Sequence, residues 1–96
     1  KLIIFLMKKY KINNNKLVFY DWYNEDIPID LLRPIKKVTF GSSYNRPLPN
    51  LMDTDIKKII FRGSFNQPID NLPKNLIHLN LGESFNLPIN KLPEAV

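Results

Sequence analysis

The sequence repeats one short motif three times: FNQPI at residues 65–69, YNRPL at 44–48 and FNLPI at 85–89. The first residues of these copies are 21 and then 20 positions apart. A further step back by 21 positions reaches YNEDI at 23–27, which keeps the aromatic residue, the Asn and the Ile but has Asp26 in place of Pro. Such a period is typical of repeat proteins, in which each copy forms one coil that its neighbours cover.

The stretch before each motif recurs as well. It places apolar residues at three fixed offsets, at Ile35, Val38 and Phe40, at Ile56, Ile59 and Phe61, and at Leu76, Leu79 and Leu81. Asn14, Leu17 and Phe19 form a weaker fourth copy. The alternation at the end of each copy is typical of a β-strand. Strands separated by a full coil run parallel to one another.

Prolines are dense in the segments that return from one strand to the next, at positions 47, 49, 68, 73, 88 and 93. Proline removes a backbone donor and breaks a helix interior, so these segments are expected to be irregular. Parallel crossovers are right-handed. We therefore predict a mainly β fold: a leucine-rich-repeat-like, right-handed solenoid of short parallel strands with Pro-rich irregular return segments.

The repeats define the expected organisation of the chain. Residues 14–96 divide into copies at about 14–34, 35–55, 56–75 and 76–95, and residues 1–13 are an N-terminal cap or linker. Within that segment, Leu2 to Met7 is expected to form a capping helix or strand. Val96 falls where Leu76 would recur, so we expect either a further repeat or an exposed edge there.

The recurrent motif resembles the FNIP repeat family, whose name spells a Phe-Asn-Ile-Pro core. The resemblance extends over residues 14–96, and Asp26 and Asn14 depart from the pattern. It implies a protein-interaction module of the kind found in social amoebae and giant viruses of amoebae. In some members an N-terminal F-box accompanies repeats that would select a ubiquitin-ligase substrate. Thirteen residues before the repeats are too few for an F-box, so that role is implied only for a longer parent protein.

Two sets of aligned residues are candidates for special roles. The first is a structural ladder at the strand ends, where an inward Asn can satisfy turn amides: Asn24, Asn45, Asn66 and Asn86. The second is a partner-binding face at outward strand positions: Lys16, Val18, Lys37, Thr39, Lys58, Ile60, Arg62, His78 and Asn80. The net charge of +5 favours a protein partner with an acidic surface. The alternative is that these lysines only keep the face solvated.

Catalysis and metal binding are not expected. The chain lacks cysteine, which excludes disulfides and thiolate sites and fits a reducing, intracellular and cytoplasmic setting. His78 is the only histidine, and no carboxylate aligns with it. There is no Gly-rich phosphate loop, and no apolar run is long enough to span a bilayer. We expect neither an enzyme nor a cofactor.

Other kinds of binding stay open. Anionic surfaces or nucleic acids suit the basic charge, but arginine is scarce and no aromatic column accompanies the lysines, so nucleic acid is not favoured. Residues 1–11 mix apolar residues with Lys8, Lys9 and Lys11, a pattern typical of calmodulin targets, of membrane-surface segments or of a simple cap. The resemblance also implies calmodulin binding. Partner identity and oligomeric state are not determined by the sequence.

Overall fold

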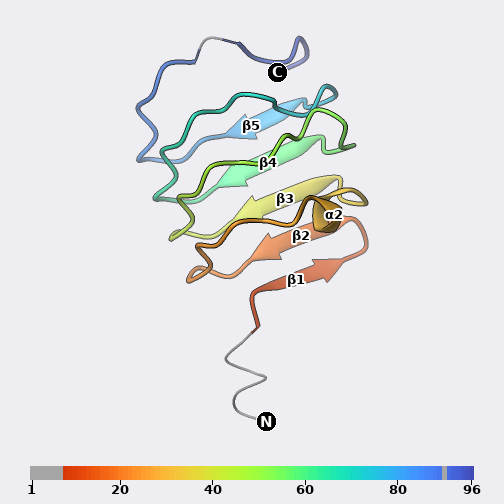
Figure 1. Ribbon diagram of the computed structural model, residues 1–96, viewed down its shortest axis with the longest axis vertical. Coiled ribbons are helices and arrows are strands. Elements are labelled where there is room, and N and C mark those ends of the chain that lie inside the picture. Colours follow the sequence, from red (N-terminus) through yellow and green to blue (C-terminus); the bar gives the residue numbers. More distant parts are fainter. Residues whose placement is uncertain (1–7, 90) are drawn as a thin grey trace.

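The alternating segments form the five strands of a single open sheet. They are β1 (Tyr10–Asn13), β2 (Lys16–Phe19), β3 (Lys37–Phe40), β4 (Lys58–Phe61) and β5 (His78–Asn80), and their order in the sheet is their order in the chain. In this computed structural model, which describes residues 8–89 and 91–96, they stack along the long axis of the molecule (Figure 1). The predicted mainly β fold is confirmed, whereas the capping element expected at Leu2–Met7 lies outside the described residues.

Strands β2 to β5 are parallel, as the repeat predicts. Lys16 pairs with Lys37, Lys37 with Lys58, and Lys58 with His78. The neighbouring position follows the same register from Leu17 to Val38, Ile59 and Leu79. Each strand therefore comes from one repeat, and equivalent positions of the repeats align in columns.

Strand β1 runs antiparallel to β2, and no repeat predicts it. Tyr10 pairs with Phe19, and Asn13 pairs with Lys16. The connecting turn includes Asn14, whose φ of 57° lies in the left-handed region that Asn tolerates better than most residues. Asn at positive φ is typical of tight hairpin turns between antiparallel strands. The described end of the 1–13 segment is thus an edge strand of the sheet.

The inward side chains of the strands and the aromatic residues of the motifs build the core. Phe19, Phe40 and Phe61 stack in one row, with ring centroids 5.2 and 4.7 Å apart. A second row runs alongside at the motif position, with successive centroids between 6.1 and 6.3 Å apart, through Tyr23, Tyr44, Phe65 and Phe85. Buried aromatic rings of this size contribute much of the apolar area that holds one coil to the next.

The two tyrosines of the motif row differ in their hydroxyl groups. The Tyr23 hydroxyl donates a 3.1 Å hydrogen bond to the backbone oxygen of Asp26. The Tyr44 hydroxyl is buried and has no hydrogen-bond partner. Burial raises the pKa of both phenols, because the ionised form would lose its hydration.

The first return segment contains a helical turn, α2 (Ile29–Leu32), which contradicts the expectation that every return is irregular. Pro28 stands at the N-cap with a φ of −64°, a position where proline does not interrupt helical hydrogen bonds. Pro34 follows only after the turn has ended. Residues 41–57 and 62–77 contain turns and bends without helix or strand, in keeping with prolines inside those returns.

Burial decreases in the fourth repeat. Ile69 in the third coil is 5% exposed, whereas Ile89 at the equivalent place in the fourth is 49% exposed. Leu79, Leu81 and Phe85 are only partly buried. The described part of the chain lays no further coil against these residues, so they are less covered than the equivalent residues of earlier coils.

Candidate interaction face

Every second side chain of the strands points away from the core, and together these side chains form the outer sheet face. Its members are Lys11, Asn13, Lys16, Val18, Lys37, Thr39, Lys58, Ile60, His78 and Asn80. Two columns cross the parallel strands on this face. We call Lys16, Lys37 and Lys58 the lysine column, and Val18, Thr39 and Ile60 the central column. Neighbouring strands bring members of a column to about 4.8 Å from one another along the sheet.

The outer sheet face carries positive charge only. None of the nine acidic residues of the chain lies on a strand. Five basic residues outside this face are paired with carboxylates, as in Lys9–Glu25 at 2.8 Å and Arg46–Asp26 at 3.4 Å. Within the described residues, no ion pair involves a lysine of the outer sheet face. The lysines of the sheet therefore have no carboxylate partner among the residues that the structure describes.

Exposure varies across the predicted binding positions. Lys16 is exposed, and Lys37 and Lys58 are half-buried. In the central column, Val18 is 37% exposed and Ile60 is half-buried, whereas Thr39 is only 4% exposed. Thr39 is the smallest member of its column and lies between two larger β-branched side chains. It forms the floor of the face and presents little surface to a partner.

The remaining predicted residues lie at the borders of the face. His78 is exposed on β5 beside Lys58, and no carboxylate shares its column. The Asn80 side-chain oxygen accepts a 3.0 Å hydrogen bond from the backbone N–H of Gly82, so it belongs to the turn after β5. Arg62 is exposed just beyond β4, where its backbone N–H donates to the oxygen of Phe40 at 3.2 Å.

Lys11 and Asn13 also belong to the face, and the repeat pattern did not reveal them. Lys11 pairs with Val18, and directly opposed residues of an antiparallel pair project from the same side of a sheet. Two sequence signals could have identified this strand. Residues 10–13 alternate between apolar and polar, and the following Asn-Asn pair is a hairpin-turn signal.

The four aligned Asn residues form hydrogen bonds between coils. The backbone N–H of Asn45 donates to the side-chain oxygen of Asn24 at 2.8 Å, and that of Asn66 donates to Asn45 at 2.9 Å. The N–H of Asn86 donates to Asn66 at 3.0 Å. The side chains of Asn24, Asn45 and Asn66 therefore each satisfy a backbone donor of the next coil, and these residues are placed to hold coils together.

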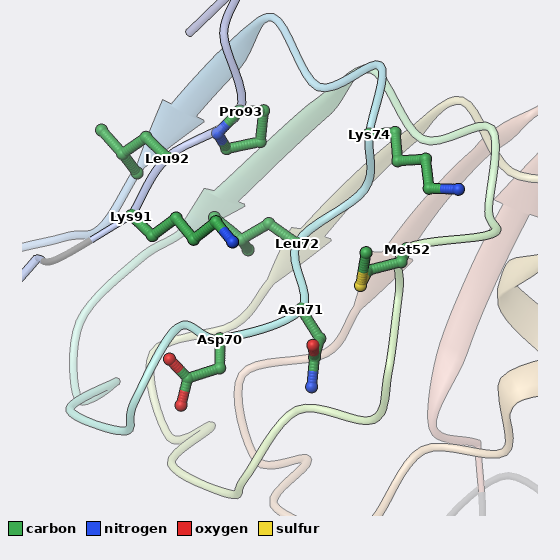
Figure 2. A pocket seen from close by; sticks show the side chains of 8 residues that line it. All are labelled: Met52, Asp70, Asn71, Leu72, Lys74, Lys91, Leu92 and Pro93. Atoms are coloured by element: carbon green, nitrogen blue, oxygen red, sulfur yellow. The ribbon is translucent and has the colours of Figure 1, made fainter.

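The return side of the molecule has an open hollow of about 350 Å³ (Figure 2). Its lining comprises Met52, Asp70, Asn71, Leu72, Lys74, Lys91, Leu92 and Pro93. The side chains of Lys74 and Lys91 supply its positive charge, and Lys74 also lies 3.7 Å from Asp53. The lining contains no Ser, Thr, Cys or His.

Two further properties of the described residues concern function. No cluster of His, Cys, Asp and Glu in them is arranged to hold a metal ion. Among the same residues, no helix combines the length and apolar character needed to cross a membrane.

Comparison with known proteins addresses the repeat itself. A family model described as FNIP Repeat matches residues 65–94, which begin at the third motif and extend through the fourth. No curated protein and no solved structure matches the chain. The matched residues contain two of the motif copies on which the resemblance rests, with strand β5 between them. The resemblance to the FNIP repeat family is confirmed for residues 65–94, which hold the third and fourth motif copies.

Proposed function

We propose that this chain is a protein-interaction module whose outer sheet face binds an acidic segment of a partner protein. The observation that carries the proposal is the array of Lys11, Lys16, Lys37 and Lys58 on one face of the sheet, with no carboxylate among them. In this proposal the stacked repeats form a leucine-rich-repeat-like, right-handed solenoid, and its strand side supplies the binding surface.

The lysine column has an electrostatic cost in the free protein. Like charges directly opposite one another on adjacent strands repel by a few tenths of a kcal/mol or more. The basic residues in the turns avoid this cost through partners such as Asp26 and Glu25. Carboxylates of a bound protein would neutralise the column in the same way. The proposal thus explains an arrangement that folding alone does not favour.

The side chains of the face support binding rather than catalysis. His78 has Lys58 as its neighbour on β4, so no carboxylate orients the imidazole as a general base. The hollow on the return side has no Ser, Thr, Cys or His in its lining. We propose a role without enzymatic activity or cofactor, in an intracellular setting that suits the cysteine-free sequence. Residues 1–13 would act as a cap or linker for the repeats. Selection of a substrate within a longer F-box protein is one binding role of this kind.

Calmodulin binding through the basic N-terminal segment has less support. Calmodulin binds amphipathic helices, whereas residues 10–13 form β1 in the sheet. Lys9 is also engaged by Glu25 at 2.8 Å. Helix formation there would require β1 to leave β2.

Binding of a labelled acidic peptide tests the proposal directly. The variant Lys37→Glu with Lys58→Glu reverses two charges of the lysine column. The control Lys74→Glu with Lys91→Glu makes the same change in net charge around the hollow on the return side. We expect fluorescence anisotropy to show salt-dependent binding that the first variant loses and the control keeps. Equal loss of peptide binding in both variants would show that binding depends on net charge alone, and would refute a binding site on the sheet.

A further inference from the structure

We propose that the acidic partner segment binds as an amphipathic α-helix lying across strands β2 to β4. Its apolar stripe rests on the central column, and its carboxylates face the lysine column. This inference rests on the proposed function, because it specifies the shape and chemistry of the partner for the same face.

Apolar and positively charged side chains form separate rows on the outer sheet face. Val18 and Ile60 present apolar surface on either side of Thr39, which is nearly flush with the sheet at 4% exposure. The lysine column lies two residues away along the strands, or about 6.6 Å. The apolar strip therefore runs across the strands and not along them, with a row of positive charge parallel to it. A complementary partner needs an apolar stripe beside an acidic one.

On the side away from the lysine column, the central column is bordered by the residues that follow the strands. Tyr20 follows β2 and Arg62 follows β4, and Gly41 lies between them. Gly41 has no side chain, and a Cβ there would lie 2.7 Å from the backbone oxygen of Tyr20. The backbone of the first coil packs against Gly41, so no side chain rises from the middle of this border. A rounded partner such as a helix fits a strip with a shallow floor at Thr39 and Gly41 better than a flat strand does.

The spacing between the strands matches the spacing of side chains on an α-helix. To contact each strand once, a partner must present a side chain on the same face every ~4.8 Å. An extended strand does so every ~6.6 Å, and a polyproline II helix every ~9.3 Å. An α-helix does so at i, i+3 and i+4, with steps of about 4.5 and 6 Å. Crossing from β2 to β4 covers ~9.6 Å, close to the ~10.5 Å between helix positions i and i+7.

The chemistry of the face also distinguishes a helix from single-stranded nucleic acid. Such strands bind through bases stacked on aromatic side chains beside a basic groove. None of the outward strand residues described here is aromatic, and the central column offers aliphatic groups instead. An acidic helix with Leu, Ile or Val at i, i+3 or i+4, and i+7 uses both columns.

Three peptides of about 18 residues and identical composition test the helical pose. The first carries apolar and acidic residues at helical spacing. The second permutes them into strict alternation, and the third exchanges a central helical residue with a terminal proline, which breaks the helix. We expect the first to bind at least about tenfold more tightly than the others and to gain helical circular dichroism when bound.

Protein variants locate the peptide on the face. Ile60→Thr keeps a β-branched side chain on β4 but makes the central column polar, and we expect binding of the helical peptide to weaken by about tenfold. Lys37→Glu with Lys58→Glu should weaken it further, and Lys74→Glu with Lys91→Glu should leave it within about twofold. Melting temperatures of the variants verify that each remains folded.

The outcomes separate the two levels of the proposal. If the alternating or proline peptide binds as tightly as the helical one, and Lys37→Glu with Lys58→Glu still abolishes binding, the helical pose is wrong and the acidic-partner function stands. If no acidic peptide binds, both proposals fail. Tighter binding of a random single-stranded oligonucleotide, lost in the same double variant, would overturn both in favour of nucleic acid.

Discussion

The side-chain oxygen of Asn45 accepts a 2.9 Å hydrogen bond from the backbone N–H of Asn66, one coil further along the chain. The same bond joins Asn24 to Asn45 and Asn66 to Asn86. A turn amide that would otherwise lack a partner is satisfied by a side chain of the preceding coil. Removing the Asn45 side chain leaves the partly buried N–H of Asn66 without its acceptor, and that loss exceeds the net value of an ordinary hydrogen bond.

We expect Asn66→Ala to lower the free energy of unfolding by about 0.5–1.5 kcal/mol, because the exposed Asn86 N–H loses its acceptor and only water can replace it. Urea denaturation measures the change. Asn75→Ala is the control: Asn75 is exposed and makes no side-chain hydrogen bond in the structure, so its replacement should cost less than about 0.5 kcal/mol. Equal stability of Asn66→Ala and the native protein would show that the ladder contributes nothing.

The buried hydroxyl of Tyr44 predicts a stabilising substitution. Phe occupies the equivalent place in the next two repeats, and the hydroxyl at position 44 has no partner. We expect Tyr44→Phe to raise the free energy of unfolding by up to about 1 kcal/mol, because an unsatisfied polar atom leaves the core. Tyr23→Phe is the contrasting variant, since it removes a hydroxyl that donates to Asp26. A destabilised Tyr44→Phe would reveal a partner for the hydroxyl, such as a buried water.

The same residue predicts a pH dependence. Burial raises the pKa of Tyr44 above its ordinary value of 10.0, so the unfolded chain releases this proton at lower pH than the folded chain. Stability is full below pH 10 and decreases as the pH rises above it. Tyr44→Phe should therefore lose less stability than the native protein between pH 8 and about pH 11. Urea denaturation at both values measures this, and parallel losses would contradict the assignment.

Gly41 lies where the chain of the second coil approaches that of the first. A Cβ at this position would lie 2.6 Å from the Cα of Asp21, and backbone atoms cannot move aside easily. We expect Gly41→Ala to destabilise the protein by about 1–3 kcal/mol. Gly63→Ala is the control in the next repeat, one position beyond the equivalent of Gly41, where the nearest atom is 3.1 Å away and the loss should be smaller. Thermal unfolding of the two variants gives the comparison.

Relief of charge repulsion gives a further prediction for the lysine column. Lys37 lies between Lys16 and Lys58, so Lys37→Thr removes two repulsive pairs and adds a good strand residue. We expect a gain of a few tenths of a kcal/mol at low salt that shrinks at high salt. Lys91→Thr, in a return segment, should show no comparable gain. Stabilisation together with weaker acidic-peptide binding would indicate that the column serves binding at the expense of folding.

Periodic residues made much of this fold predictable. Ile59 and Leu79 occupy matching positions in their repeats, so parallel pairing of β4 with β5 follows from spacing alone. Strand β1 has no copy, and a rule based on recurrence is silent about Lys11. The helical turn at Ile29–Leu32 depended on where Pro28 stands relative to the turn, which proline density does not reveal.

The candidate face was only partly readable from the sequence. Register places Thr39 between Val18 and Ile60, but burial of Thr39 depends on the sizes of its neighbours and on the chain around them. Which lysines pair with carboxylates required three dimensions, because Lys36 and Asp55 lie far apart in the sequence and 3.7 Å apart in the structure. Charges at the surface are weakly constrained by folding, so their pattern identifies a face and not its partner.

The Asn ladder also determines how this architecture tolerates change. Each coil supplies one side-chain acceptor to its successor and one backbone donor to its predecessor. Loss of the Asn45 side chain would therefore remove the acceptor of the Asn66 amide, which lies in a different repeat from the altered residue. Conversely, an entire inserted repeat carries both one backbone donor for the preceding coil and one side-chain acceptor for the following coil. Gene duplication or deletion of whole repeats can thus lengthen or shorten the protein and leave every junction chemically equivalent, whereas a single exchange of Asn cannot.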